Sequence, residues 1–396
     1  MRTGSEDRNG PERPAGAFAS ASKDDRMAND PPFARETIAI VGVGLIGGSL
    51  GVALKGLGIG RRIVGISRQE TLDAAVGLDV IDAGYRYEDL ETGIRDASLV
   101  FLCTPIVRIL DLLPEVLGAA RQDTVVTDVG STKHAIVSAA AAHHRDDVHF
   151  VGGHPMAGSE HRGVGAADPF LFQNAIYVLT PSPDTPGFVV EKLARLVRAF
   201  GARPMRMTPQ EHDRAAAAVS HLPQMMATSL VSMIGRMAED DGLPIRMAAG
   251  GFRDLTRIAS SPFEMWRDIC RTNATPIREM IDLYIESLSA IRENVDHDRL
   301  EQAFTYANRI RGQIPKDSKG FLHPLHEILL LAEDRPGVIA HVARTLAGES
   351  ININDIEVLN VREGEGGTIR MGFDSRPCAE RAVDVLAKAG YSVRLR

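Results

Sequence analysis

Short runs of apolar and β-branched residues alternate with stretches of helical spacing from Glu36 to about Arg206. This alternation is typical of a parallel sheet covered by helices. Six of the runs are bounded by Gly, Pro or charged residues and have the length and composition of buried strands. They span residues 37–42, 62–67, 98–104, 124–128, 149–152 and 175–179. The pattern therefore predicts an α/β domain of the Rossmann type over residues 35–207.

The pattern changes after Thr208, where strand formers become few and the apolar positions take helical spacing. Thr208 with Glu211 three residues later predicts a capped helix start. The helices that continue to about Arg311 are too apolar to stand alone, so they must pack on each other or on a second subunit. We therefore expect an all-α substrate and dimerisation domain over residues 208–312, and a homodimer.

Three further segments complete the chain. Residues 313–324 are rich in Gly, Pro and Lys and are predicted to be a linker. Residues 325–396 have the order strand, helix, strand, strand, helix, strand, which predicts a small α+β (βαββαβ) domain. Residues 1–34 mix charge with Gly, Ser, Ala and Pro and are predicted to be a disordered N-terminal tail.

Composition excludes several classes of protein. The apolar fraction of 44% and the charged fraction of 24% are ordinary for a globular protein. A net charge of −7 and the lack of a long basic run argue against nucleic acid as a partner. The three cysteines match neither a disulfide framework nor zinc spacing, and no histidine pair has metal-binding spacing, so we expect no metal. Without a signal sequence or an apolar run of about 18 residues, we expect a cytoplasmic protein with no membrane partner.

A glycine-rich turn carries the strongest single motif. Gly42, Gly44 and Gly47 form G-x-G-x-x-G between the predicted strand TIAIVG and the helix that opens with Leu45 and Ile46. Such glycines allow a tight turn, close approach of a pyrophosphate and close helix packing, while the helix N-terminus attracts negative charge. An ordinary glycine-rich turn is the alternative. The motif in this context predicts a dinucleotide site.

The residues downstream of the turn bear on the choice of cofactor. A site specific for NAD places Asp or Glu about 20 residues after the last glycine, and this chain has Ser67 followed by Arg68 there. A hydroxyl with a guanidinium can hold a 2′-phosphate, so we favour NADP over NAD. Arg68 as a simply solvated arginine is the alternative. Thr104 and Pro105, at the end of the next strand, are expected to line the nicotinamide side.

Two polar loops follow the next two predicted strands. DVGSTK contains Ser131, and GGHPMAGSE contains His154. Both loops belong to the carboxyl edge, where such sheets bind ligands. A histidine there can take a proton from a substrate hydroxyl while hydride leaves the same carbon, and a nearby serine can fix the ring's tautomer. A structural histidine is the alternative for His154.

The helical region adds candidates for substrate binding. Asp254, Arg257 and the single tryptophan, Trp266, lie in GGFRDLTRIASSPFEMWRDI. Arg257 can grip a substrate carboxylate with support from Asp254, or the two can simply pair on one helix face. His221 lies in an apolar helix, where a satisfied core histidine is an equal alternative.

Together these segments resemble the prephenate and arogenate dehydrogenase family of tyrosine biosynthesis, over roughly residues 36–311. The evidence is the order of GVGLIGGSL, TP, DVGSTK, GGHPMAGSE, HDRAAAAVSHLP and GGFRDLTRIASSPFEMWRDI along the chain. The resemblance implies oxidative decarboxylation, in which NAD(P) takes hydride, carbon dioxide leaves and the ring becomes aromatic. The product is 4-hydroxyphenylpyruvate from prephenate, or tyrosine from arogenate.

The same resemblance implies roles for particular residues. His154 polarises the 4-hydroxyl, Ser131 orients His154 and the substrate, and Arg257 holds a substrate carboxylate. Glu160 and His221 match residues that shape the family's pocket, and Trp266 lies in a matching segment, so all three are expected to be secondary site residues. Gln224 departs from the family, which often has a second histidine there, so a role of that position in pocket polarity is in doubt.

The C-terminal residues from Glu327 resemble an ACT domain, a module that binds amino acids, through EDRPGVIAHVARTLAGESINI. The resemblance implies that the effector contacts the turn into the helix and the strand that follows the helix. These contacts are Asp334, Pro336, Gly337, Asn352 and Ile353. Tyrosine feedback is the natural hypothesis, and an assembly module without a ligand is the alternative.

Other functions are compatible with parts of the sequence. Arogenate differs from prephenate only by an amino group in place of the keto oxygen, and turnover of both would define a broad cyclohexadienyl dehydrogenase. A β-hydroxyacid dehydrogenase would need a catalytic lysine on the helical domain, where this chain has GGFRDLTR. A non-catalytic sensor of NADP and an amino acid is disfavoured by Ser131, His154 and Arg257. Prephenate dehydrogenase is therefore the expected function.

Overall fold

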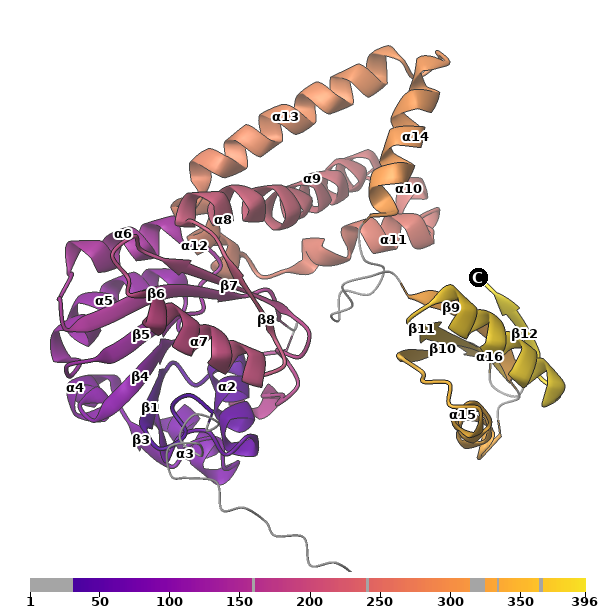
Figure 1. Cartoon of the computed structure of the whole chain (residues 1–396). Coiled ribbons are helices and arrows are strands. Elements are labelled where there is room, and N and C mark those ends of the chain that lie inside the picture. The colour runs from indigo at the N-terminus through magenta and orange to yellow at the C-terminus, as the bar shows by residue number, and fades with distance from the viewer. Residues whose placement is uncertain (1–30, 159–160, 240–241, 314–324, 333–334, 363–365) are drawn as a thin grey trace, which may run out of the picture.

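The structure is a computed structural model that describes residues 31–158, 161–239, 242–313, 325–332, 335–362 and 366–396. Figure 1 shows three regions that follow one another along the chain: a helix-covered sheet, a group of helices, and a small second sheet. The predicted linker lies almost entirely outside the described residues, as do residues 1–30 of the predicted tail. Phe33, which falls within the predicted tail of residues 1–34, is buried in the core of the first region, so the tail prediction is wrong at this residue.

The first region is built on an eight-stranded sheet of order β3-β2-β1-β4-β5-β6-β7-β8. The strands are β1 (Thr37–Val41), β2 (Arg62–Ile66), β3 (Ala83–Tyr85), β4 (Ala97–Leu102), β5 (Thr124–Asp128), β6 (Val148–Pro155), β7 (Ile176–Pro181) and β8 (Arg203–Arg206). The central strands are almost wholly buried because helices cover both faces, which explains their continuous apolar runs.

The sheet differs from the all-parallel prediction in one respect. β7 pairs antiparallel with β6, in a register that sets His154 opposite Val178. β3 and β8 were not predicted. Both are short and partly exposed, so they lack the apolar run that marked the other strands.

Two sets of helices cover the two faces. α2 (Leu45–Gly56), α3 (Gln69–Gly77) and α7 (Gly187–Ala199) pack into one apolar cluster, which also buries the short 3-10 helix η2 (Val164–Ala166). The opposite face is covered by α4 (Leu90–Ile94), α5 (Ile106–Ala119) and α6 (His134–Ala142). The second cluster also contains Trp266, Ile269 and Ile277 from the helical region, so this face of the sheet is where the helical region packs.

The helical region begins at the predicted residue. The Thr208 hydroxyl accepts a hydrogen bond from the main-chain N–H of Glu211, and the Glu211 carboxylate accepts one from Thr208 N–H. The elements that follow are α8 (Pro209–Ala216), the π-helix η3 (Ala217–His221), α9 (Leu222–Met237), α10 (Leu243–Arg246), α11 (Gly250–Thr256), the 3-10 helix η4 (Arg257–Ser260), α12 (Phe263–Thr272), α13 (Ala274–Glu293) and α14 (Arg299–Arg311). Figure 1 shows α9, α13 and α14 extending away from the large sheet.

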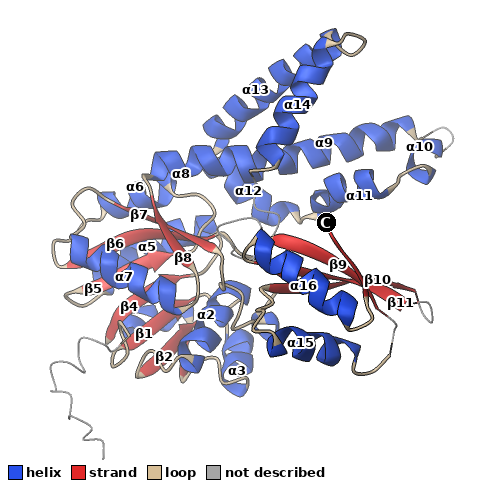
Figure 2. Ribbon diagram, turned by 45° about the vertical axis from the view of Figure 1, so that its right-hand side comes forward, coloured by secondary structure: helices blue, strands red, loops and turns tan. Residues whose placement is uncertain are grey.

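The small second sheet has the predicted βαββαβ order. Its elements are β9 (His326–Ala332), α15 (Val338–Gly348), β10 (Asp355–Arg362), β11 (Gly366–Phe373), α16 (Arg376–Lys388) and β12 (Ser392–Leu395). The strands lie in the order β10-β11-β9-β12, and both helices cover one face (Figure 2). Apolar residues of β9, β11, α15 and α16 form a core of their own.

Candidate active site

The turn between β1 and α2 is as tight as its glycines predict. Gly42 has a φ of +95°, and its N–H donates to the Ile66 carbonyl at 2.8 Å. A Cβ on Gly42 would lie 2.8 Å from the Thr104 methyl group, and one on Gly47 would lie 2.1 Å from the Gly42 carbonyl oxygen. These two glycines are therefore required by the packing of the turn itself.

Gly44 is different because its missing Cβ leaves open space. No atom lies within 4 Å of where that Cβ would stand. Gly44 is the N-cap of α2, which has no side-chain cap and no acidic residue in its first turn. The main-chain N–H groups in the first turn of this helix can therefore bind an anion. The turn therefore fits a dinucleotide pyrophosphate, with Leu45 and Ile46 opening the helix that would hold it.

The end of β2 gathers cationic and hydroxyl groups. Ser67 is buried and hydrogen-bonds the phenol of Tyr87, whose pKa burial raises above its usual value. The Arg108 guanidinium lies 5.3 Å from the centre of the Tyr87 ring. Arg68 is exposed and acts on the same phenol electrostatically. Sequence reasoning found Ser67 and Arg68 but missed Arg108, because it comes from α5.

The loop from β4 to α5 holds the other predicted cofactor contacts. Thr104 is buried, and its hydroxyl has no hydrogen-bond partner among the described residues. Pro105 is the N-cap of α5. The Asp268 carboxylate of α12 accepts from Val107 N–H at 3.3 Å, so the helical region packs directly against this loop.

His154 lies near the carboxyl end of β6 and has a histidine as its partner. Its Nδ1 is 2.8 Å from Nε2 of His212 on α8, and the ring centres are 5.0 Å apart. Nδ1 of His212 is in turn 2.8 Å from Oδ1 of Asp213. His212 and Asp213 were not predicted as site residues, although they begin the motif HDRAAAAVSHLP.

Asp213 fastens this group to the turn that carries Ser131. Its carboxylate accepts from Lys133 N–H at 2.7 Å and from His134 N–H at 2.9 Å. Its main-chain carbonyl accepts from the amide of Asn273 at 2.8 Å. Three parts of the chain far apart in sequence therefore meet at one buried residue, Asp213.

A buried ion pair contacts Gly153, the residue before His154. The Lys133 ammonium contacts the Asp128 carboxylate, and neither side chain is exposed. Lys133 Nζ also donates to the Gly153 carbonyl at 2.7 Å, and Asp128 accepts from Gly153 N–H at 3.0 Å. The ion pair thus holds the strand on which His154 lies.

Burial decides the charge of the two histidines of the site. The pKa of His154 is well below its usual range, first because burial penalises the imidazolium and then because the Lys133 ammonium, and any positive charge on His212 or His221, would repel it. Burial also lowers the pKa of His221 to about 4. Both rings are neutral near pH 7, so His154 can accept a proton.

Ser131 lies on the turn between β5 and α6, partly exposed. Among the described residues no hydrogen bond joins it to His154, whose Nδ1 is bonded to His212 instead. The predicted role of Ser131 in orienting the ring and the substrate stays a prediction.

His221 and Trp266 lie together at the boundary with the helical region. The rings meet edge to face, with centres 5.9 Å apart. His221 Nδ1 is 3.1 Å from the amide of Asn273, while the buried Nε1 of Trp266 has no partner in the described part of the chain. Gln224 is buried nearby in α9, and its amide is 3.4 Å from the Thr228 hydroxyl.

The remaining predicted substrate contacts are placed differently. Asp254 on α11 and Arg257 at the start of η4 are exposed, and no described contact joins them to His154. Glu160 lies outside the described residues. In the described ranges no three His, Cys, Asp or Glu side chains form a group that could hold a metal ion, and no described helix is long and apolar enough to cross a membrane.

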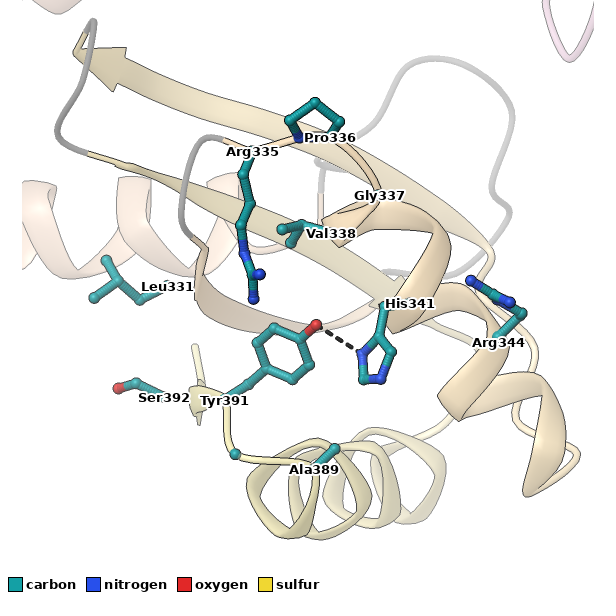
Figure 3. A pocket seen from close by; sticks show the side chains of 11 residues that line it. Leu331, Arg335, Pro336, Gly337, Val338, His341, Arg344, Ala389, Tyr391 and Ser392 are labelled. Atoms are coloured by element: carbon teal, nitrogen blue, oxygen red, sulfur yellow. Dashed lines mark hydrogen bonds between the residues drawn. The ribbon is translucent and has the colours of Figure 1, made fainter.

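A cavity lies at the small sheet (Figure 3) and has a volume of about 470 Å³. Nδ1 of His341 on α15 is 2.8 Å from the Tyr391 hydroxyl inside it. Pro336 and Gly337 line it as well, and Gly337 begins α15 with a φ of +92°. Cationic side chains reach it from Arg335 and Arg344. Asn352 and Ile353 do not line this cavity, and Asp334 lies outside the described residues.

Comparison with known families matches all three regions. Residues 50–206 match the model "Prephenate dehydrogenase, nucleotide-binding domain", residues 208–308 its "dimerization domain", and residues 326–388 the "ACT domain". The chain is 38% identical to prephenate dehydrogenase of Bacillus subtilis over 362 residues, which cover 89% of this chain and 97% of that protein. The chain belongs to the prephenate dehydrogenase family. The predicted Rossmann, helical and ACT regions of this family member are thereby confirmed.

Solved structures agree with the family assignment. Prephenate dehydrogenase of Aquifex aeolicus, in complex with hydroxyphenyl propionate and NAD+, superposes with a TM-score of 0.65 at 30% identity, covering 70% of this chain and 96% of that one. Arogenate dehydrogenase of Synechocystis superposes with a TM-score of 0.62 at 32% identity, covering 69% and 98%.

Proposed function

We propose that this member of the prephenate dehydrogenase family oxidatively decarboxylates prephenate to 4-hydroxyphenylpyruvate with NAD(P)+. The observation that carries the proposal is the neutral, hydrogen-bonded His154 at the carboxyl edge of a sheet whose glycine turn fits a dinucleotide. The Aquifex relative binds a hydroxyphenyl compound together with NAD+, which supports a substrate that becomes a phenol.

The residues of this chain supply the proton chemistry. Nε2 of His154 takes the proton of the 4-hydroxyl as the carbon beneath it is oxidised, and burial keeps this nitrogen free to accept. Ser131 binds the same hydroxyl from the neighbouring turn. Arg257 holds a substrate carboxylate, with Asp254 supporting it. Glu160, His221 and Trp266 shape the pocket.

The glycine turn holds the cofactor, which when bound accepts hydride. Gly42, Gly44 and Gly47 allow the pyrophosphate to approach the N-terminus of α2. Thr104 and Pro105 line the nicotinamide side. At the other end, the hydroxyl of Ser67 and the guanidinium of Arg68 favour NADP, and Arg108 beside Tyr87 adds further positive charge there.

Arogenate is the second candidate substrate. The observation that favours it is the likeness to the Synechocystis arogenate dehydrogenase. Rates with prephenate and with arogenate, each with NAD and NADP, decide between the two. Activity on neither would refute the proposal, and equal activity would define a broad cyclohexadienyl dehydrogenase.

His154→Asn should lower kcat by about a hundredfold or more while NAD(P) still binds, because a positioned base contributes on that scale.

The ACT domain is proposed to bind tyrosine as a feedback effector. The cavity at Pro336 and Gly337 has the cationic side chains of Arg335 and Arg344 for a carboxylate, and its size suits an amino acid. Adding tyrosine to the rate assay should inhibit the wild type, and Arg344→Ala should weaken that inhibition. Inhibition that persists unchanged in the variant would place the effector elsewhere.

The helical domain is proposed to form a homodimer. α9, α13 and α14 expose large apolar side chains, among them Met233, Ile285 and Phe304. Exposed apolar surface on this scale is typical of a protein interface. Light scattering should give twice the mass of the chain, and Phe304→Asp should lower it.

A further inference from the structure

His154, His212 and Asp213 form a continuous hydrogen-bonded chain between β6 and the start of α8. We propose that His212 and Asp213 are positioning residues that keep Nε2 of His154 free of a proton and then receive the proton that His154 takes up. The inference rests on the proposed role of His154 as the base. Two contacts of 2.8 Å carry it: His154 Nδ1 to His212 Nε2, and His212 Nδ1 to Asp213 Oδ1.

The direction of the chain follows from Asp213. An ionised carboxylate only accepts hydrogen bonds, and this one already accepts two from the main-chain N–H groups of Lys133 and His134. Nδ1 of His212 must therefore carry the hydrogen that it shares with Asp213. A neutral His212 then has a bare Nε2, so His154 donates through Nδ1. The remaining nitrogen of His154, Nε2, is left with its lone pair.

The proton that leaves the substrate has a defined route. It passes from the substrate hydroxyl to Nε2 of His154, the Nδ1 proton of His154 passes to Nε2 of His212, and one positive charge ends on His212 beside Asp213. One O–H and one N–H bond break and two N–H bonds form, with no change of oxidation state. When carbon dioxide has left and the ring is aromatic, His212 returns the proton through His154 to the phenolate oxygen, which gives the 4-hydroxyl of the product.

The surrounding charges favour this transfer. A positive charge on His154 would be buried and close to the Lys133 ammonium, whereas on His212 it is paired with the Asp213 carboxylate. Asp128 is already neutralised by Lys133. The phenol of Tyr177 and the thiol of Cys103 stay neutral because burial raises the pKa of each. His221 is also neutral, and the amide of Asn273 lies against its Nδ1.

Two variants separate positioning from proton transfer. His212→Gln keeps an acceptor for His154 and a donor for Asp213 but cannot hold the transferred proton. Asp213→Asn removes the negative charge beside His212, while its amide oxygen can still accept from His212 Nδ1 and from Lys133 N–H, which share Oδ1 in the wild type. We expect kcat to fall about tenfold or more in the first and about a hundredfold or more in the second, with the KM for prephenate and NAD(P) binding within about threefold.

The pH profile is a readout that a merely structural role would not move. In both variants the acid limb of kcat/KM should shift to lower pH. The reason is that neither variant can hold a proton on His212 next to the Asp213 carboxylate. Nitrogen-15 shifts of labelled protein should place the proton of the neutral His154 on Nδ1 in the wild type. Thr272→Val is the matched control. It removes a 2.8 Å hydroxyl contact with Thr132 at the same domain boundary and leaves the hydrogen bonds among His154, His212 and Asp213 in place.

The outcomes separate this inference from the proposed function. If His154→Asn keeps full turnover, the base assignment fails. If His154→Asn is inactive while His212→Gln and Asp213→Asn keep the wild-type rate and acid limb, only the inference on His212 and Asp213 is overturned. Asp213→Asn could unfold because it loses a main-chain contact. In that case the kinetics of His212→Gln and the nitrogen shifts of the wild type still test whether His212 receives the proton.

Discussion

The ammonium of Lys133, which has no exposed side-chain surface, donates a 2.7 Å hydrogen bond to the carbonyl of Gly153. Lys133 thereby ties the strand that carries His154 to the turn that carries Ser131. Its other partner is the buried carboxylate of Asp128. The strand and the turn of the site are therefore held together by an ion pair with no exposed side-chain surface.

Replacing Lys133 should be costly for stability. Lys133→Met leaves Asp128 buried without its counter-charge, which costs about 3–5 kcal/mol of unfolding free energy. Urea denaturation measures this loss. The control is Arg198→Met, because the exposed pair of Arg198 with Glu191 is expected to contribute less than about 1 kcal/mol. Equal losses in the two variants would contradict a special role for the buried pair.

Substitutions at two glycines of the same turn should have different effects. Gly44→Val fills open space at the N-terminus of α2, so the protein should fold normally but bind NAD(P) at least about tenfold more weakly. Gly47→Ala places a Cβ 2.1 Å from the Gly42 carbonyl, so it should lower the melting temperature. Thermal unfolding and cofactor titration of both variants check this. Normal cofactor binding by Gly44→Val would place the pyrophosphate elsewhere.

Arg68 should bind the 2′-phosphate of NADP. Arg68→Ala removes a charge-assisted hydrogen bond worth about 1.5–3 kcal/mol, so the Kd for NADP should rise roughly ten- to a hundredfold while that for NAD changes little. Arg108→Ala should have a smaller effect in the same direction, because Arg108 is stacked near Tyr87. Equal weakening of both cofactors would show that Arg68 does not contact the phosphate.

His221 should make stability depend on pH. Its pKa is about 4 in the folded protein, below the ordinary 6.5, so between these values the unfolded chain binds the proton first. The unfolding free energy should therefore fall as the pH is lowered from 6.5 to 4, by about 3 kcal/mol from this residue. His221→Gln should remove that part of the slope, whereas the exposed His297→Gln should not. A slope unchanged in His221→Gln would contradict the assignment.

The sequence by itself determined the three regions and the dinucleotide turn. Strand and helix periods are local properties, as are the glycines at 42, 44 and 47 and the capping box of Thr208 with Glu211. The structure contains each of these where the pattern predicted it. Motif order was sufficient to predict the family, because it needs no knowledge of which residues touch.

Only the tertiary structure decided which side chains meet. His154 and His212 are 58 residues apart, and Asp213 reaches N–H groups 80 and 79 residues earlier in the chain. The antiparallel pairing of β7 and the approach of Arg108 to Tyr87 likewise join segments with no shared local pattern. Periodicity along a chain encodes which face of an element is buried. The partner on that face is set by packing between elements, and the neutral, hydrogen-bonded state of His154 follows from that packing alone.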